Sequence, residues 1–112
     1  MLTRSHRFHG YNSLKSVYLR GKNIRAGSIS LRYERRTPAK PYRVAVVVSR
    51  KVNKSAVVRN RIRRRIYEAV RHQADKVPAG YDLVFTVYED NIAQLEPPKI
   101  FELVGSILEK IA

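Results

Sequence analysis

The sequence predicts an α+β protein, a two-layer α/β sandwich in which helices pack on a sheet of about four strands. Two patterns lead to this prediction: stretches of alternating polarity, and stretches with apolar side chains at helical spacing. Their order along the chain is helix, strand, strand, helix, strand, helix. A length of 112 residues without an internal repeat or a linker predicts one domain over residues 1–112.

The first half of the chain begins with a predicted helix and continues with predicted strands. Residues 11–20 have apolar side chains at helical spacing, and Gly21 follows where a helix would end. Residues 28–33 alternate strictly between polar and apolar side chains, so we expect a strand with one buried and one exposed face. A further short strand fits between residues 22 and 27.

Two more segments have the character of strands that are apolar on both faces. Residues 43–49 form a β-branched run, which is typical of a central strand. Pro38 and Pro41 separate this run from the preceding strand, because proline cannot donate to a β-ladder. Residues 82–88 predict a further strand, and a turn at residues 77–80 precedes it.

Two longer helices are predicted from apolar stripes. The first covers residues 55–72 and has a narrow stripe of Val58, Ile62, Ile66 and Ala69. The second begins at Pro97, since proline is tolerated in the first turn of a helix. Its expected buried face consists of Ile100, Leu103, Val104, Ile107, Leu108 and Ile111.

The charge of the chain predicts a polyanionic partner. Lys and Arg number 23 against nine Asp and Glu, which gives a formal net charge of +14. Residues 1–71 hold 20 of the basic side chains and only two of the acidic ones. An excess of this size, concentrated in one part of the chain, favours nucleic acid ahead of an acidic membrane.

No catalytic or metal-binding constellation is visible in the sequence. The chain has no cysteine, and its three histidines stand apart from one another. We therefore expect no catalytic residue, and no metal or cofactor bound by the chain alone. No apolar run approaches the ~18 residues of a membrane span, and the N-terminus lacks the apolar region of a signal peptide, so we expect a cytoplasmic protein without a membrane partner.

The predicted helix over residues 55–72 is also the most basic part of the chain. Residues 50–71 hold nine Lys or Arg side chains and one acid, Glu68. Between Arg59 and Arg71 there are six arginines and no lysine, which favours bidentate contact with phosphate. Repulsion among so many like charges would be offset by the phosphates of a partner.

The segment SRKVNKSAVVRNRIRRRIYEAVR, residues 49–71, resembles the signature of bacterial ribonuclease P protein subunits. The mark of that signature is an Arg-Asn-Arg helix, and the triplet is Arg59-Asn60-Arg61 in this chain. The similarity spans nearly the whole chain. It continues at Arg7-Phe8, Leu14, Val17-Tyr18, Gly21 and residues 78–82.

The resemblance implies a fold and an activity. It implies a left-handed β-α-β crossover through the arginine-rich helix, against the usual handedness rule. It also implies the non-catalytic protein subunit of an endoribonuclease, in which a catalytic RNA removes the 5′ leader of precursor tRNA (tRNA 5′ maturation). Mg²⁺ is then required by the RNA subunit. The expected partners are ribonuclease P RNA and precursor tRNA, and no protein partner is required.

The resemblance further implies roles for individual residues. Contacts with the catalytic RNA are expected at Arg50, Lys51, Lys54, Arg59, Asn60, Arg61, Arg63, Arg64 and Arg65. A cleft for the single-stranded leader is expected at Leu14, Tyr18 and Arg32, with Tyr11 and Val46 as neighbours. The family usually has an aromatic residue where Leu14 stands, and often one where Arg32 stands.

Two other functions fit parts of the sequence. A structural RNA-binding protein of the ribosomal type, without an enzyme complex, would have the same composition and charge. A DNA-binding module is less well supported, because no helix-turn-helix or zinc signature accompanies the basic helix.

Overall fold

The computed structural model describes residues 11–36 and 41–111, and side chains from Ser16 onward. In chain order the helices and strands are α1 (Tyr11–Arg20), β1 (Lys22–Ala26), β2 (Ile29–Arg35), β3 (Arg43–Val48), α2 (Ala56–His72), β4 (Tyr81–Val87) and α3 (Pro97–Leu108). Two short 3₁₀ helices, η2 (Ala74–Lys76) and η3 (Asp90–Ala93), precede β4 and α3. The predicted elements are therefore present in the predicted order.

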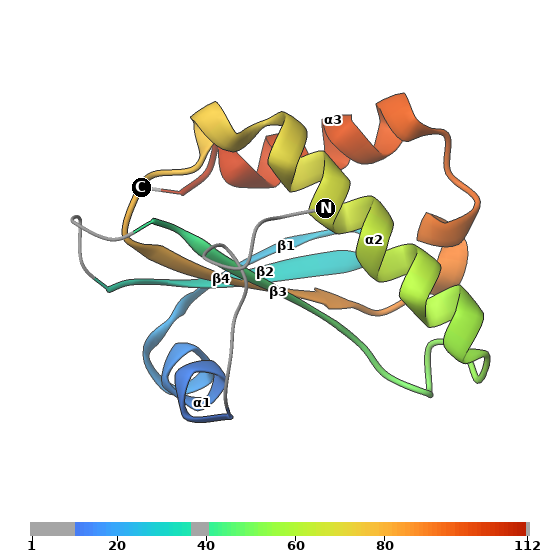
Figure 1. Ribbon diagram of the computed structural model, residues 1–112, viewed down its shortest axis with the longest axis horizontal. Helices are drawn as coiled ribbons and strands as arrows, with labels where there is room; N and C mark the ends of the chain where they lie inside the picture. The colour runs from blue at the N-terminus through green and yellow to red at the C-terminus, as the bar shows by residue number, and fades with distance from the viewer. Residues whose placement is uncertain (1–10, 37–40, 112) are drawn as a thin grey trace.

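One four-stranded sheet in the order β1-β2-β4-β3 forms the centre of the molecule. The pairs β1–β2 and β2–β4 are antiparallel, whereas β3 and β4 are parallel. Helices α2 and α3 cover one face of the sheet, and α1 lies on the other face (Figure 1). The predicted two-layer sandwich corresponds to the sheet with α2 and α3, and α1 adds a short third layer.

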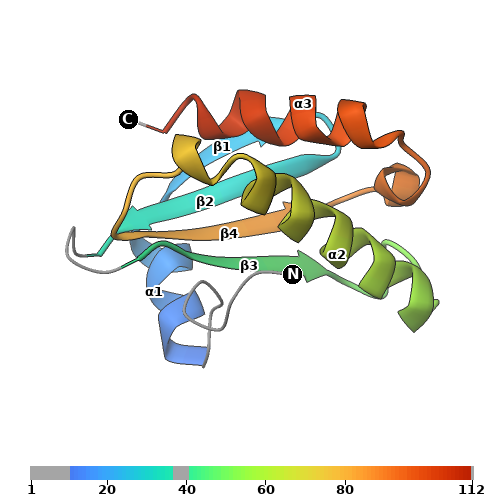
Figure 2. The same ribbon diagram turned by 45° about the horizontal axis from the view of Figure 1, so that its top comes forward.

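The connection from β3 to β4 runs through α2. Because these strands are parallel neighbours, the chain must cross over one face of the sheet. In Figure 2, α2 lies in front of the sheet while both strands point the same way, and the crossover from β3 to β4 is left-handed. This is the rare hand that the family resemblance implies.

The main core lies between the sheet and helices α2 and α3. Alternate residues of β2, β3 and β4 point into it, and Leu31, Phe85 and Val46 lie side by side across the three strands. From α2, Ile62 and Ile66 are fully buried in the same cluster. The other buried helical residues are Ala69, Val70, Ile100, Val104, Ile107 and Leu108. The predicted stripe of α2 is thus the face that holds the helix on the sheet.

A much smaller cluster joins α1 to the opposite face. Val17 of α1 is fully buried against Ala45 of β3 and Val84 of β4. At one side of this contact, Ser16 Oγ donates a 2.9 Å hydrogen bond to Glu34 Oε2. Helix α1 therefore covers only part of its face of the sheet.

The prediction that residues 43–49 form a central strand is wrong. Among the described residues, strand β3 lies at an edge of the sheet and pairs only with β4. Its apolar residues are nevertheless buried on both faces, since Val44 packs under the helices and Ala45 packs under α1. Apolar residues on both faces of a strand therefore indicate that helices pack on both sides of the sheet. They do not indicate how many strands pair with that strand.

The prediction of an exposed polar face on β2 is wrong at its first half. Ser28 and Ser30 are buried, at 8% and 3% exposure. The hydroxyl of Ser30 shares a 2.9 Å hydrogen bond with the hydroxyl of Tyr88, which follows β4. A polar side chain can be buried when it has a hydrogen-bond partner. The alternation of polar and apolar residues along a strand does not show whether such a partner exists.

Helix α2 begins with a capped turn and lies along the β3 edge of the sheet. Ser55 is the N-cap, and its hydroxyl accepts a hydrogen bond from the N–H of Val58. Tyr67 packs against the core from α2, and its hydroxyl accepts a hydrogen bond from the N–H of Val46 at 3.3 Å. In the described part of the chain, no helix has the length and apolar character needed to span a membrane.

We expect Ile62→Asp to unfold the protein, because an unpaired carboxylate would replace a fully buried side chain at the centre of the core. The penalty of several kcal/mol compares with a net stability of ~5–15 kcal/mol for a domain of this size. Thermal melting followed by circular dichroism measures the loss. Val57→Asp is the matched control, since Val57 is 75% exposed on the same helix. Equal melting temperatures for the two variants would contradict the assigned orientation of α2.

Candidate nucleic-acid interface

Hydrogen bonds of the side chains of Asn53 and Arg59 hold the loop before α2 in place. The side chain of Asn53 accepts a 2.8 Å hydrogen bond from the N–H of Ser55 and donates to Asp90 at 3.0 Å. Arg59, one turn into the helix, donates to the carbonyls of Asn53 and Lys54. Arg59 therefore holds the loop against the first turn of the helix, and its predicted contact with RNA would use the donors that remain.

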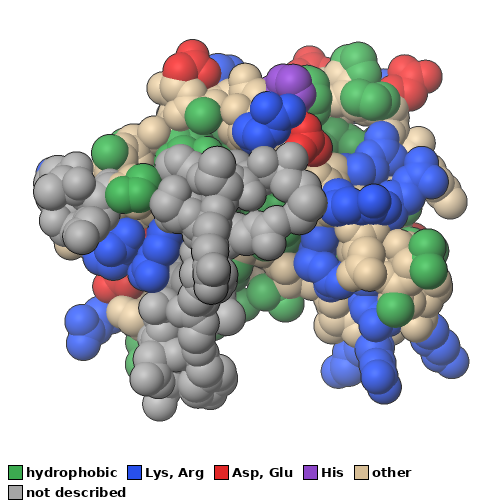
Figure 3. All heavy atoms as spheres, viewed as in Figure 1, with side chains coloured by type: hydrophobic (Ala, Val, Ile, Leu, Met, Phe, Trp, Pro, Cys, Tyr) green, Lys and Arg blue, Asp and Glu red, His purple; other side chains and the backbone are tan. Residues whose placement is uncertain are grey.

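The cations before α2 and on its outer face form an exposed basic surface. Its exposed members are Arg50, Lys51, Lys54, Asn60, Arg61 and Arg64. Figure 3 shows Lys and Arg side chains gathered at the end of the molecule where α2 begins. A hollow beside the first turn is lined by Arg50, Lys51, Lys54, Ala56 and Arg59. The fold thus concentrates positive charge where the sequence predicts contact with RNA.

Arg63 is half-buried on the flank of the helix. Its guanidinium donates to the side-chain oxygen of Asn60, one turn earlier. This bond orients the amide of Asn60 within the predicted Arg-Asn-Arg motif. The two residues are therefore coupled, and Arg63 helps position Asn60.

Arg65 has a structural role that the sequence does not predict. Its guanidinium donates to the carbonyls of Ile92 and Ala93, at 3.1 and 2.6 Å, and also to that of Leu95. Burial, together with the positive charge of Arg61, lowers the pKa of Arg65. Arg65 thus ties α2 to the segment that enters α3, and fewer of its donors are available to a phosphate than in Arg61 or Arg64.

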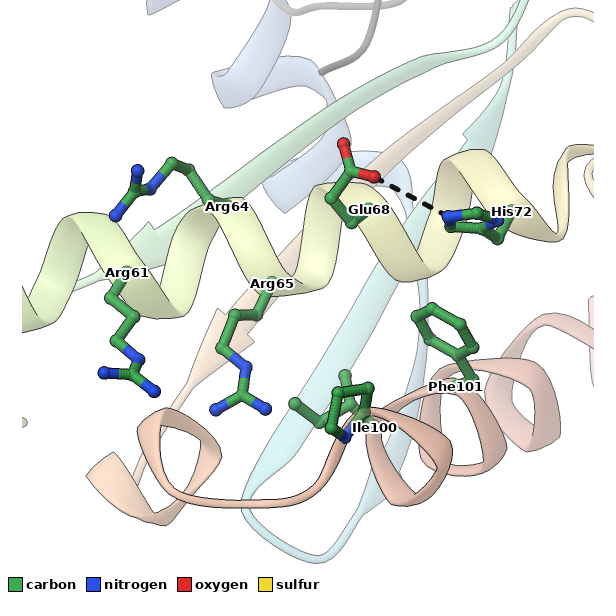
Figure 4. A pocket seen from close by; sticks show the side chains of 8 residues that line it. Arg61, Arg64, Arg65, Glu68, His72, Ile100 and Phe101 are labelled. Carbon is green, nitrogen blue, oxygen red and sulfur yellow. Dashed lines mark ion pairs between the residues drawn. The ribbon is translucent and has the colours of Figure 1, made fainter.

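A pocket of about 300 Å³ opens between α2 and α3 beside this contact (Figure 4). Its apolar part comes from Pro97, Ile100 and Phe101, and its rim from Arg61, Arg64, Arg65, Glu68 and His72. In Figure 4, Arg61 and Arg65 point from α2 toward the segment before α3, whereas Arg64 points the other way. Arg64 therefore faces away from the helix pair.

Glu68 is the one acidic side chain on α2, and the neighbouring Arg71 compensates its charge. Arg71 donates to it at 2.8 Å, and His72 lies 3.7 Å away. The hydrogen bond from Arg71 lowers the pKa of Glu68 below its usual range. The carboxylate therefore weakens the positive potential of the last turns of α2, and the basic surface is strongest in the first half of the helix.

On the other sheet face, where α1 is the helix that the structure describes, Tyr18 and Arg32 lie together, as the family resemblance implies. Arg32 donates a 3.1 Å hydrogen bond to the carbonyl of Tyr18, and its guanidinium carbon lies 5.9 Å from the centre of the tyrosine ring. The side chain of Tyr18 is 41% exposed. The pair offers an aromatic ring and a cation on one surface, which suits a single-stranded nucleic acid.

The prediction that Val46 neighbours this pair is wrong. Val46 is buried in the main core under α2, on the opposite face of the sheet. Its chain neighbours Ala45 and Val47 lie on the α1 side instead. The side chains of Tyr11 and Leu14, also predicted for this cleft, lie outside the described residues.

Asp82 is a buried residue whose role the sequence does not show. It is 3% exposed near the start of β4. Arg43 binds both of its oxygens, at 2.9 and 2.8 Å, and Arg36 donates at 3.1 Å. The hydrogen bond with Asp82 raises the pKa of Arg43. Three segments are thus joined here, and among described residues no group of three potential metal ligands occurs.

The comparisons with known proteins decide which kind of nucleic-acid-binding protein this is. The family model described as Ribonuclease P matches residues 2–112. The chain belongs to the ribonuclease P protein family. Of the functions that the sequence leaves open, the ribonuclease P subunit is therefore the one supported, and family membership implies association with ribonuclease P RNA.

Relatives and solved structures agree with this family. The chain is 35% identical to a ribonuclease P protein component of Picosynechococcus sp., over 77% of this chain and 73% of that protein. It is 31% identical to one of Synechocystis sp., over 95% and 90%. The ribonuclease P proteins of Thermotoga maritima (TM-score 0.82, 20% identity, 95% and 97% of the two chains) and Staphylococcus aureus (TM-score 0.80, 18% identity, 95% and 94%) share the fold.

We expect Arg65→Ala to destabilise the protein, because it leaves carbonyls of the segment before α3 without their donor. An unsatisfied buried polar group costs about 1–3 kcal/mol. Urea unfolding measures this loss. Arg64→Ala is the matched control, since Arg64 is exposed, and its stability should stay within about 0.5 kcal/mol of the unaltered protein. Equal stability of both variants would rule out the structural role of Arg65.

Proposed function

We propose that this chain assists the removal of the 5′ leader from precursor tRNA by binding two RNA elements on two different surfaces. The outer face of α2 and the loop before it bind the ribonuclease P RNA. The open sheet face beside α1 binds the single-stranded leader. The observation that carries this proposal is the exposed, nearly acid-free basic surface at the start of α2, in a chain of this family.

The basic surface suits structured RNA. Its arginines lie on a rigid helix that the core and the Ser55 cap hold in place. Guanidinium groups can bind phosphates in bidentate fashion, and the release of counterions from RNA favours their binding. Affinity for the RNA partner should therefore depend strongly on salt.

The sheet face suits a flexible strand of RNA. Single-stranded RNA is commonly recognised through bases that stack on aromatic rings and on arginine planes. Tyr18 and Arg32 present both kinds of group next to each other. A leader held there would distinguish precursor tRNA from mature tRNA, which lacks it.

The chemistry of cleavage belongs to the RNA in this proposal. Divalent metal ions such as Mg²⁺ would be held by the RNA, and the protein chain would contribute binding and orientation. The active assembly would need the RNA and this chain without another protein, and would work in the cytoplasm, where precursor tRNA is processed.

Arg61→Ala and Arg64→Ala should each weaken binding of the ribonuclease P RNA and reduce its salt dependence. Each lost phosphate contact lowers the slope of log affinity against log salt by roughly one unit or somewhat less. Filter binding over a salt series measures the slope. Both side chains are exposed, so the fold should not change.

The matched control for this series is Lys99→Ala, which removes an exposed cation from the first turn of α3. It should leave the salt slope unaltered. Slopes that are the same for all three variants and the unaltered protein would mean that α2 does not bind the RNA.

Tyr18→Ala should weaken binding of precursor tRNA by the reconstituted assembly of this chain with its ribonuclease P RNA. A base stacked on an aromatic ring contributes about 1–3 kcal/mol, or roughly fivefold to over a hundredfold in affinity. Binding of mature tRNA should not change. Leu19→Ala is the control, since Leu19 is 73% exposed on the same helix.

The unaltered assembly should also cleave precursor tRNA faster at low magnesium than the RNA alone, and this rate tests the proposed function as a whole. If the chain gives no acceleration, the proposed function is wrong. If Tyr18→Ala weakens precursor and mature tRNA equally, Tyr18 is a packing residue and the leader lies elsewhere.

A further inference from the structure

Tyr88 is a second tyrosine on the α1 side of the sheet, and it is held in place but exposed at the surface. It directly follows β4, and its N–H donates a 2.8 Å hydrogen bond to the carbonyl of Ser28. Its hydroxyl shares a 2.9 Å hydrogen bond with Ser30, whereas the residue as a whole is 44% exposed. Both ends of the residue are therefore held, and no apolar cluster buries the ring.

Arg25 of β1 lies against this ring. Its guanidinium carbon is 4.0 Å from the centre of the Tyr88 ring, well within the range of a cation–π contact. The same side chain donates a 3.1 Å hydrogen bond to the carbonyl of Gly27. Gly27 has φ +60° in the two-residue turn between β1 and β2, so the turn positions the arginine's acceptor. Arg25 is thus oriented before any ligand arrives.

The strand register puts this pair next to Tyr18 and Arg32. Arg25 pairs directly with Ser30, and Ser30 holds the Tyr88 hydroxyl. Arg32 lies two residues further along β2, so its side chain points to the same face, about 7 Å away. That face is the one on the α1 side, since Val84, the partner of Arg32, packs against α1.

We propose that Tyr88 and Arg25 form a second stacking site for a base of single-stranded RNA, beside the site at Tyr18 and Arg32. The inference rests on the proposed function and extends the leader-binding surface toward the β1–β2 turn. Every base has a π-face, so two such sites would bind leaders of different sequence. The two arginines would also favour the phosphates between the stacked bases.

The spacing of the sites makes a prediction about leader length. Because about 7 Å of strand β2 separates Ser30 from Arg32, one leader can occupy both sites only when it is long enough to span them, and our proposal takes the site at Tyr18 as the one that the leader reaches first. The gain in affinity should therefore come in two steps as the leader grows. The second step should depend on Tyr88 and the first should not.

The test uses the reconstituted assembly with the chain's own ribonuclease P RNA and precursor tRNAs whose leaders are lengthened one nucleotide at a time. Tyr88→Ala should remove the second step in affinity, a loss of roughly fivefold to a hundredfold for long leaders. Short leaders and mature tRNA should bind as before. Tyr88→Phe keeps the ring and should keep the second step. Leu19→Ala, which also removes a large exposed side chain on this side of the molecule, should retain both steps.

Three results would overturn the proposal. The first is an unaltered length dependence in Tyr88→Ala. The second is an equal loss in Tyr88→Phe, which would assign the effect to the Ser30 hydrogen bond. The third is an equal loss for mature tRNA. Tyr18→Ala in the same series distinguishes failure of the Tyr88 site from failure of the proposed function. If Tyr18→Ala removes the first step in affinity, the leader binds this face of the sheet, whatever the result for Tyr88.

Discussion

The packing of α2 on the sheet is the constraint on which the rest of the structure depends. Only a narrow stripe, centred on Ile62 and Ile66, anchors this helix in the core. A narrow stripe leaves the outer face of the helix exposed, and Arg61 and Arg64 lie on that face. These like charges repel one another within the helix, and the burial of the stripe offsets that repulsion. The hydrophobic stripe therefore holds together an arrangement of charge that serves a partner rather than the fold.

The arginines of this chain fall into two groups that composition cannot separate. Arg61 and Arg64 are exposed. Arg65 instead donates to backbone carbonyls, and Arg43 donates to the carboxylate of Asp82. Guanidinium groups suit both tasks, because their planar fork satisfies several acceptors at once. The arginines thus stabilise the fold as well as provide a binding surface. Arg65 and Arg43 connect segments that lie far apart in the sequence.

The sequence could predict the elements and the exposed basic surface, and it failed where side chains make specific long-range contacts. Periodicity located α2 and its buried stripe, because helical spacing follows directly from burial on one side. It misplaced β3 at the centre of the sheet, since apolar residues on both faces say nothing about neighbouring strands. It assigned Val46 to the wrong face, and it gave no sign that Arg65 binds carbonyls some thirty residues later. Spacing along the chain does not encode these partners.

The edge position of β3 has a consequence for the behaviour of the protein in concentrated solution. Among the described residues β3 is an edge strand rich in valine, and such a strand is a template for pairing with another chain. The hydroxyl of Tyr67 occupies the N–H of Val46 in the middle of this strand. A side chain from α2 thereby interrupts the row of donors that an incoming strand would need. The helix that carries the basic surface thus also protects the sheet against edge-to-edge aggregation.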